Sequence, residues 1–268
     1  MKNILVPVGS TENGINNLRY AVNFAHMSGA KVYLINLYKE FSKVGQLTKV
    51  NQLIIDENEA QLEEVMNAVD TKGVEVMAKA IKGDPFEGIA RISNQLNIDL
   101  IIISPQSTDI KDEIYLGNTT GKLVKQTDIP MLIVPRNYLF RKFGTILLAL
   151  KNGHFENKDV LNPLKDIVHL FSSKLDLLHV ITPEGTGGSK DLDRKLVEIS
   201  DSITITKNAT TFQGVLEHFQ SHKPDMLCVI RRKRGFFKKL WEKNVIMKKE
   251  FHTSIPLLIL SGRQDLGH

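Results

Sequence analysis

The sequence predicts an α/β protein made of two tandem doubly wound domains, each a five-stranded parallel sheet flanked by helices. Short apolar runs alternate with stretches of helical periodicity, which is typical of βαβ units. The same order of elements occurs twice along the chain with matched spacing, which indicates an internal repeat. A length of 268 residues also suits two ordinary domains better than one.

The first copy alternates predicted strands and helices. The helix at 12–27 has apolar residues at helical spacing and ends at Gly29. The polar helix at 48–69 has four apolar residues assigned to one side, namely Leu53, Ile54, Leu62 and Val65. A third helix begins with Asp84 as its N-cap and Pro85 in its first position, and runs to about Leu96. The predicted strands are 4–8, 31–37, 74–81, 99–104 and 131–135.

The second copy repeats this order over fewer residues. Its predicted strands are 145–150, 174–181, 202–206, 225–230 and 256–260, and its helices are 157–172, 191–199 and 211–221. The helix at 191–199 is a reduced counterpart of the one at 48–69. We therefore place the first domain at 1–138 and a shortened, degenerate second domain at 144–268. The linker is not enriched in Gly or Ser, which predicts closely packed domains.

The composition is that of an ordinary globular protein, with 42% hydrophobic and 24% charged residues. The single cysteine, Cys228, lies in an apolar run, where a buried thiol is expected rather than a redox role. The apolar run at 4–8 is too short for a secretory signal, and no run is long enough to span a membrane. These features predict a soluble, cytoplasmic protein.

Several stretches of the sequence resemble the universal stress protein family. In the first half they are Ile-Leu-Val-Pro-Val at 4–8, Leu-Arg-Tyr-Ala at 18–21, the run at 99–103, Gly-Asn-Thr-Thr-Gly at 117–121 and Ile-Pro-Met-Leu-Ile-Val-Pro at 129–135. The second half resembles the C-terminal copy of tandem members at 145–150, 177–180 and 251–258. The resemblance implies an adenine-nucleotide α-hydrolase-like fold, pairing of the two domains within the chain, and a role in stress response.

The resemblance also indicates where a nucleotide would bind. Family members that bind ATP have an acidic residue after the first strand and a glycine-rich pattern after the fourth. Here Gly9 stands at the acidic position, Ser104 and Ser107 replace two glycines, and Gly117 is kept. Lys151 stands at the acidic position of the second copy. The resemblance therefore implies weak or no ATP binding, with ATP or AMP as possible ligands and no required cofactor.

The candidate ligand-binding residues lie at the predicted carboxyl edge of the first sheet. In open α/β sheets, ligands bind at this edge, where the strand order reverses. Residues 118–120 could still cap a helix and offer hydrogen-bond donors to an anion. A ligand-free helix cap is the alternative. The full set is Pro7, Val8, Gly9, Ser104, Ser107, Gly117, Asn118, Thr119 and Thr120.

A basic and aromatic segment accounts for much of the formal net charge of +5, with its excess between residues 231 and 249. The near-helical spacing of its aromatic residues favours packing on the other domain or on a second subunit over recognition of an anionic partner. The sequence has no specific nucleic-acid or membrane signature. The candidate partner-binding residues are Arg231, Arg234, Phe236, Phe237, Lys238, Lys239 and Trp241.

Other chemically capable residues suggest no reaction. His218 and His222 are four residues apart on a predicted helix, but without a third ligand a solvated helix face is favoured over a metal site. His179 lies in a strand and is predicted to be a buried, hydrogen-bonded core residue. The sequence has no nucleophile elbow, Walker loop or Cys/His pair.

We therefore expect no catalytic residues. The predicted function is stress response through binding of a ligand or an unknown signalling partner, and two tandem chains could pair further into a homodimer. One alternative is an ATP/AMP-binding switch with slow ATPase activity. The other is a scaffold that binds an anionic partner through 231–249.

Overall fold

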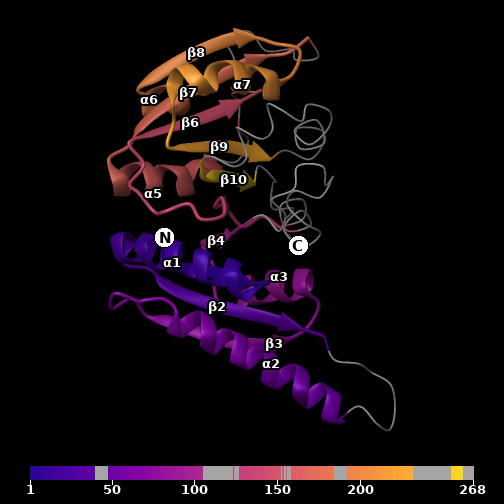
Figure 1. Cartoon of the computed structure of the whole chain (residues 1–268). Helices are drawn as coiled ribbons and strands as arrows, with labels where there is room; N and C mark the ends of the chain where they lie inside the picture. Colours follow the sequence, from indigo (N-terminus) through magenta and orange to yellow (C-terminus); the bar gives the residue numbers. More distant parts are fainter. Residues whose placement is uncertain are drawn as a thin grey trace. The chain divides into compact units, whose positions relative to one another are not determined.

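The computed structural model describes residues 1–39, 48–104, 123, 127–151, 153, 155, 158–183, 192–231 and 255–261. These residues divide into two compact units, the first ending at Phe140 and the second beginning at Arg141. Both units are parallel α/β structures with helices packed on a sheet (Figure 1).

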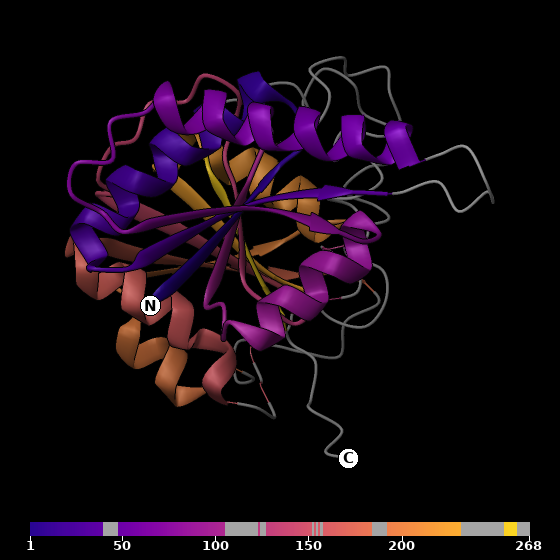
Figure 2. The same cartoon turned by 90° about the horizontal axis from the view of Figure 1, so that it is seen from below.

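The first unit has a doubly wound topology. Its sheet order is β3-β2-β1-β4-β5, and each described strand pair is parallel. Figure 2 shows α2 and α3 on opposite sides of β2. The strand order reverses at β1 and β4, which are neighbours and have buried residues on both faces. The elements are β1 (Asn3–Val8), α1 (Thr11–Ser28), β2 (Lys31–Tyr38), α2 (Thr48–Asn67), β3 (Val76–Lys82), α3 (Pro85–Gln95), β4 (Leu100–Ile103) and β5 (Met131–Ile133).

The second unit repeats this topology. Its sheet order is β8-β7-β6-β9-β10, again with parallel pairs. Read from the first strand of each unit, the order is 3-2-1-4-5 in both copies, which confirms the predicted tandem fold. The elements are β6 (Thr145–Leu150), the 3₁₀ turn η1 (Lys158–Leu161), α5 (Asn162–Phe171), β7 (Lys174–Ile181), α6 (Arg194–Ile199), β8 (Ser202–Lys207), α7 (Thr211–His222), β9 (Met226–Arg231) and β10 (Leu257–Ser261).

One aspartate in each unit holds the start of the first strand. Asp99 Oδ2 accepts hydrogen bonds from the backbone N–H groups of Lys2 and Asn3, at 2.6 and 3.0 Å. Asp225 Oδ2 does the same for Gly144, which precedes β6, and for Thr145, which begins it, at 2.8 and 3.0 Å. Both aspartates come just before the fourth strand, so the repeat extends to this side-chain contact.

The helix caps expected from the sequence are present in the first unit. The Asp84 carboxylate accepts from the N–H groups of Phe86 and Glu87, at 2.9 and 3.4 Å, and Pro85 takes the first helical position. Gly29 ends α1 with a φ of 70°, a left-handed conformation that glycine adopts without strain. These local signals therefore set the beginning of α3 and the end of α1.

The expectation for Leu53 is wrong. Leu62 and Val65 are buried under α2, but Leu53 is 66% exposed. Leu53 precedes Leu62 by nine residues, or two and a half helical turns, so the two side chains leave the helix in opposite directions. The first turns of α2 thus present apolar side chains on their outer surface.

The predicted helix at 157–172 is also corrected. The structure has the 3₁₀ turn η1 followed by α5, which begins at Asn162. Pro163 has no N–H group to donate to a carbonyl four residues back, so the α-helical hydrogen-bond pattern cannot extend upstream of it. The shortened helix α6 begins at Arg194, with the Asp193 carboxylate accepting from the N–H of Lys195 at 2.9 Å.

Candidate functional site

The carboxyl edge of the first unit lies where β1 and β4 end. Pro7 and Val8 are the last residues of β1, and Gly9 follows them. Ser104 follows β4, which is the strand next to β1. The topology thus brings these sequence-predicted residues to one edge. A Cβ added to Gly9 would meet no heavy atom of the described residues within 4 Å, so those residues leave open space at this position.

Ser104 is held in a small polar cluster. Its Oγ lies 2.5 Å from Asn17 Oδ1, to which it donates, and it accepts from Asn16 Nδ2 at 3.2 Å. Ser104 and Asn17 are 3% and 2% exposed. The hydroxyl therefore uses its proton and a lone pair within the protein. The sequence analysis missed Asn16 and Asn17, although two adjacent amides in the middle of an amphipathic helix were an available signal.

Five predicted ligand-binding residues lie outside the described part of the chain. They are Ser107, Gly117, Asn118, Thr119 and Thr120. Their role stays a prediction.

A chain of polar contacts joins β2 to the helices beside this edge. Asn36, which is 4% exposed, donates through Nδ2 to Gln61 Oε1 at 2.6 Å. Gln61 Nε2 lies 3.5 Å from Thr11 Oγ1, and Thr11 Oγ1 donates to Glu64 at 3.4 Å. These contacts connect α1, α2 and β2, so polar side chains linked by hydrogen bonds lie beside this edge.

The matching edge of the second unit has a different chemistry. Lys151 follows β6, and Arg231 ends the neighbouring β9. Arg231 is 6% exposed and donates from Nη2 to Ser261 Oγ at 3.0 Å. Cationic side chains therefore stand at the carboxyl ends of β6 and β9, the counterparts of β1 and β4: Lys151 takes the position of Gly9, and Arg231 follows Ile230, the counterpart of Ser104.

His179 is buried at the position of β7 that corresponds to Asn36 on β2. It is fully buried, and its Nε2 lies 3.2 Å from the backbone oxygen of Lys151. Its Nδ1 has no hydrogen-bond partner among the described residues. The predicted burial is confirmed, but only one of the two ring nitrogens is paired there.

The other candidate partner-binding residues are Arg234, Phe236, Phe237, Lys238, Lys239 and Trp241, and they lie outside the described residues. Of the predicted set, the structure describes Arg231, whose side chain bonds to Ser261 at the end of the adjacent strand β10. The partner-binding role of the segment stays a prediction.

The histidine pair on α7 is used structurally. His222 Nδ1 lies 2.9 Å from the backbone oxygen of His218, and its Nε2 lies 3.4 Å from Thr204 Oγ1. No group of three metal-ligating side chains is found in the described ranges. Cys228 is fully buried, and this burial raises the pKa of its thiol, as expected of a core cysteine.

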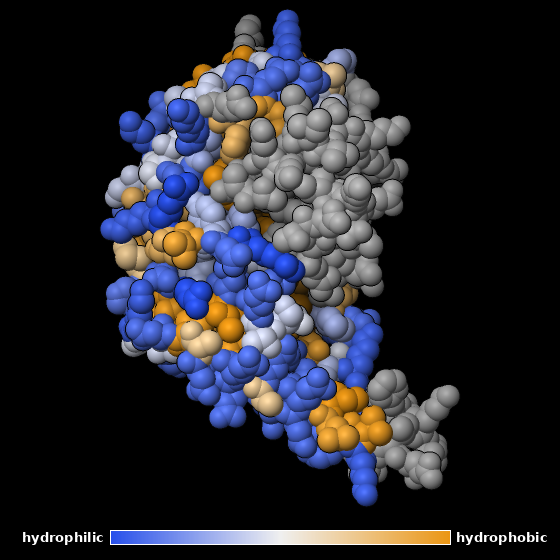
Figure 3. Space-filling view, in the orientation of Figure 1, coloured by the Kyte–Doolittle hydropathy of each residue, from blue (hydrophilic) through white to orange (hydrophobic). Residues whose placement is uncertain are grey.

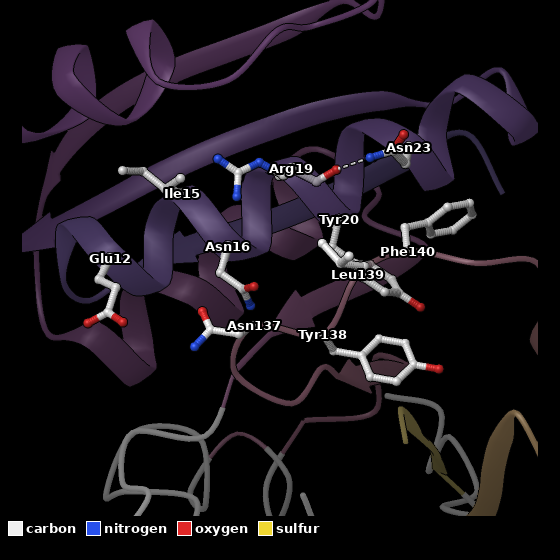
Figure 4. A pocket seen from close by; sticks show the side chains of 10 residues that line it. All are labelled: Glu12, Ile15, Asn16, Arg19, Tyr20, Asn23, Asn137, Tyr138, Leu139 and Phe140. Atoms are coloured by element: carbon white, nitrogen blue, oxygen red, sulfur yellow. Dashed lines mark hydrogen bonds between the residues drawn. The ribbon is translucent and has the colours of Figure 1, made fainter. Parts of the chain in front are cut away.

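A hollow of about 450 Å³ lies along α1, entirely within the first unit (Figure 4). One wall is the outer face of α1, and the other is the segment 137–140 that ends this unit. Phe140 packs edge-on against Tyr20, with ring centroids 5.2 Å apart. Sequence reasoning missed this hollow, because its two walls are separated by more than a hundred residues. Its lining is Glu12, Ile15, Asn16, Arg19, Tyr20, Asn23, Asn137, Tyr138, Leu139 and Phe140.

None of the helices in the described ranges has the length and apolar character needed to cross a membrane.

Comparisons with known proteins agree with this architecture. The family model of the universal stress protein family matches residues 1–135. Two universal stress proteins of Methanocaldococcus jannaschii align with half of the chain. One is 22% identical over 140 residues, which cover 50% of this chain and 82% of the relative. The other is 24% identical over 154 residues, covering 50% and 95%.

Solved structures extend the likeness to the whole chain. A universal stress protein from Archaeoglobus fulgidus has a TM-score of 0.72 at 16% identity, covering 98% of this chain and 97% of that one. A putative universal stress protein from Pseudomonas aeruginosa has a TM-score of 0.59 at 15% identity, covering 97% and 93%. These two likenesses bear on the fold alone. With the family match and the repeated topology, they show that the chain belongs to the universal stress protein family, as a tandem two-domain member.

Proposed function

We propose that this chain acts in stress response by binding a ligand or a partner, without tight ATP binding and without turnover of a substrate. The observation that carries the proposal is the carboxyl edge of the first unit, where the buried Ser104 hydroxyl is engaged by Asn16 and Asn17. Phosphate sites of α/β folds need backbone N–H groups that an anion can approach closely, which glycine permits. A buried serine side chain at this position supports a weakened phosphate site.

The residue after β1 supports the same conclusion. Gly9 offers no side chain that could hydrogen-bond to a ligand, although the described residues leave open space around it. A nucleotide at this edge would lose the acidic contact that ATP-binding relatives have. Fewer polar contacts to a ligand mean lower affinity, by about tenfold for each 1.4 kcal/mol lost.

The edge of the second unit supports an altered ligand preference. Lys151 stands where the first unit has Gly9, and Arg231 follows Ile230, the counterpart of Ser104, so none of these positions supplies a glycine. A cationic edge of a sheet attracts anions by long-range electrostatics, without the shape selection of a phosphate loop. We therefore assign to this unit at most a small anionic ligand.

Thermal unfolding of the full chain with ATP or AMP, with and without magnesium, tests the proposal. A ligand at a hundred times its dissociation constant stabilises a protein by about 2.7 kcal/mol. We expect no shift of the unfolding temperature at about 1 mM nucleotide. A clear shift that is lost in Gly117→Asp and kept in the control Gly187→Asp would overturn the proposal. It would favour the ATP/AMP switch with slow hydrolysis instead.

The third candidate, a scaffold for an anionic partner, depends on the charge excess of 231–249. Reversing Lys238 and Lys239 to Glu should abolish retention of the chain on immobilised heparin, which serves as a polyanion probe, because affinity for polyanions depends on clustered cations. Unchanged retention would rule the scaffold out.

A further inference from the structure

The hollow along α1 contains two opposite charges. Glu12 and Arg19 both line it, and both side chains are exposed (Figure 4). They are seven residues apart on one helix, which separates their Cα atoms by about 10 Å along the helix axis. Neither charge belongs to an ion pair among the described residues. The hollow therefore offers a carboxylate and a guanidinium to charged groups of a ligand.

The neighbouring charges have the same polarity along α1. At the end of the hollow beside Asn23, Lys72 Nζ donates to the Asn23 Oδ1 atom at 2.7 Å, which adds a second cation. At the opposite end, Glu64 accepts from the hydroxyl of Thr11 at 3.4 Å, which adds a second carboxylate. Three further basic residues stand next to the walls without lining the hollow, namely His26, Arg136 and Arg141, of which Arg141 pairs with Asp225.

Amide groups face the hollow from both walls. Asn16 projects from α1 and Asn137 from the segment 137–140 (Figure 4). Asn16 uses its Nδ2 to donate to Ser104 at 3.2 Å, so its Oδ1 remains an acceptor for an N–H group of a ligand. Asn137 is exposed, with a left-handed φ of 59° that asparagine tolerates. Side-chain amides that both donate and accept are suited to a ligand with alternating N–H and C=O groups.

The end of the hollow near Arg19 is apolar. The ring of Tyr20 lies 5.2 Å from that of Phe140 and 6.4 Å from that of Tyr138, centroid to centroid. Leu139 is 77% exposed on the same wall. Figure 3 shows hydrophilic and apolar side chains mixed on the face of the first unit where α1 lies in Figure 1. A mixed lining of this kind favours a ligand with both polar groups and an apolar side chain.

We propose that the hollow binds a short peptide with free ends. Its amino group lies at Glu12, its carboxylate at Arg19, its backbone beside the two amides, and the side chain of its last residue against Tyr20 and Phe140. An extended tripeptide spans about 10 Å, which matches the separation of the two charges. The volume of about 450 Å³ is also in the range of small-ligand sites. The proposal does not depend on the proposed function, because no residue of the candidate nucleotide set lines the hollow.

Calorimetric titration of the full chain with the tripeptide Ala-Ala-Phe tests the site. We expect a dissociation constant below about 1 mM. Phe-Ala-Ala should bind at least about threefold more weakly, because its aromatic residue lies at the wrong end. Acetylation of the amino group and amidation of the carboxylate should each weaken binding by about three- to tenfold, since each removes one charge pair.

Two variants assign each end of the peptide to one residue. Glu12→Gln should weaken binding of Ala-Ala-Phe by about three- to tenfold but leave the affinity of its acetylated form unchanged. Arg19→Gln should do the same for the free and the amidated forms. A variant that merely disturbed the fold would weaken all forms alike. The control Lys79→Gln removes an exposed charge on β3 and should change none of these affinities.

The proposal is overturned if Ala-Ala-Phe shows no saturable binding up to about 10 mM. It is also overturned if the two variants bind Ala-Ala-Phe as tightly as the native chain, because the peptide would then bind elsewhere. Equal weakening of the free, acetylated and amidated peptides by either variant would likewise contradict the assigned orientation. Thermal unfolding of both variants checks that they are folded.

Discussion

The two units share the contacts that join their strands and helices, but different types of residue stand at the carboxyl ends of their strands. In both, an aspartate before the fourth strand accepts the N–H groups that begin the first strand. In both, a glycine of the third helix lies against the second strand. At the carboxyl edge, however, Gly9 and Ser104 in one unit correspond to Lys151 and Ile230 in the other, and Arg231 follows Ile230. The two units thus share the same framework but differ at the carboxyl edge.

The largest expected effect comes from the shared aspartates. Asp225→Ala should destabilise the second unit by about 2–4 kcal/mol, because it removes a charged acceptor of two backbone hydrogen bonds. Asp99→Ala should act similarly on the first unit but somewhat less, since Asp225 also pairs with Arg141 at 3.4 Å. Urea unfolding measures both changes. If either variant were as stable as the native chain, the two aspartates would not be equivalent.

The two helix glycines should differ in their tolerance of alanine. A Cβ on Gly214 would lie 2.8 Å from both methyl groups of the buried Val180. A Cβ on Gly88 would clash only with the end of the Leu37 side chain. Leucine can change rotamer, whereas valine is stiff. We expect Gly214→Ala to cost about 1–3 kcal/mol and Gly88→Ala less than about 1. Thermal unfolding should show this order, and the reverse order would contradict it.

The buried polar residue of the second strand gives a smaller contrast. Asn36→Leu breaks a 2.6 Å hydrogen bond to Gln61 and should cost about 1–2 kcal/mol. His179→Leu loses one 3.2 Å contact but also removes a buried nitrogen without a partner among the described residues. Its cost should be below about 1 kcal/mol. Equal losses in urea unfolding would mean that Nδ1 has a partner.

The smallest effect is a difference in acid sensitivity between the caps of α3 and α7. The hydrogen bond from Lys39, together with that from the Phe86 N–H, lowers the pKa of Asp84 below its ordinary value of 3.8. A lowered pKa in the folded state means that stability is present above the ordinary pKa and is lost as the pH falls through the folded one. The N-cap of α7 is Thr210, whose side chain is uncharged and does not titrate in this pH range. Asp84→Asn should therefore reduce the loss of stability below about pH 4, and Thr210→Asp should increase it. Urea midpoints at several pH values measure both.

Local signals in the sequence predicted most of the framework. The N-cap at Asp84 and the end of α1 at Gly29 both lie where they were expected, because they depend on neighbouring residues only. Leu53 was misplaced because its helix has apolar residues on two sides. The two adjacent amides Asn16 and Asn17 were a signal in the sequence, but their pairing with Ser104 depends on how β4 and α1 meet and was not predicted. The hollow beside Phe140 escaped for the same reason.

The most direct test of the altered edges is to count the nucleotide bound per chain by equilibrium dialysis. At about 0.1 mM ATP, the native chain should bind fewer than about 0.1 molecules, as expected for a dissociation constant above about 1 mM. Gly9→Asp combined with Ser104→Gly restores two residues of the ATP-binding pattern in a space that can accept them, and should raise this number. One ATP bound per native chain would show that the first unit still holds nucleotide, and would contradict the account.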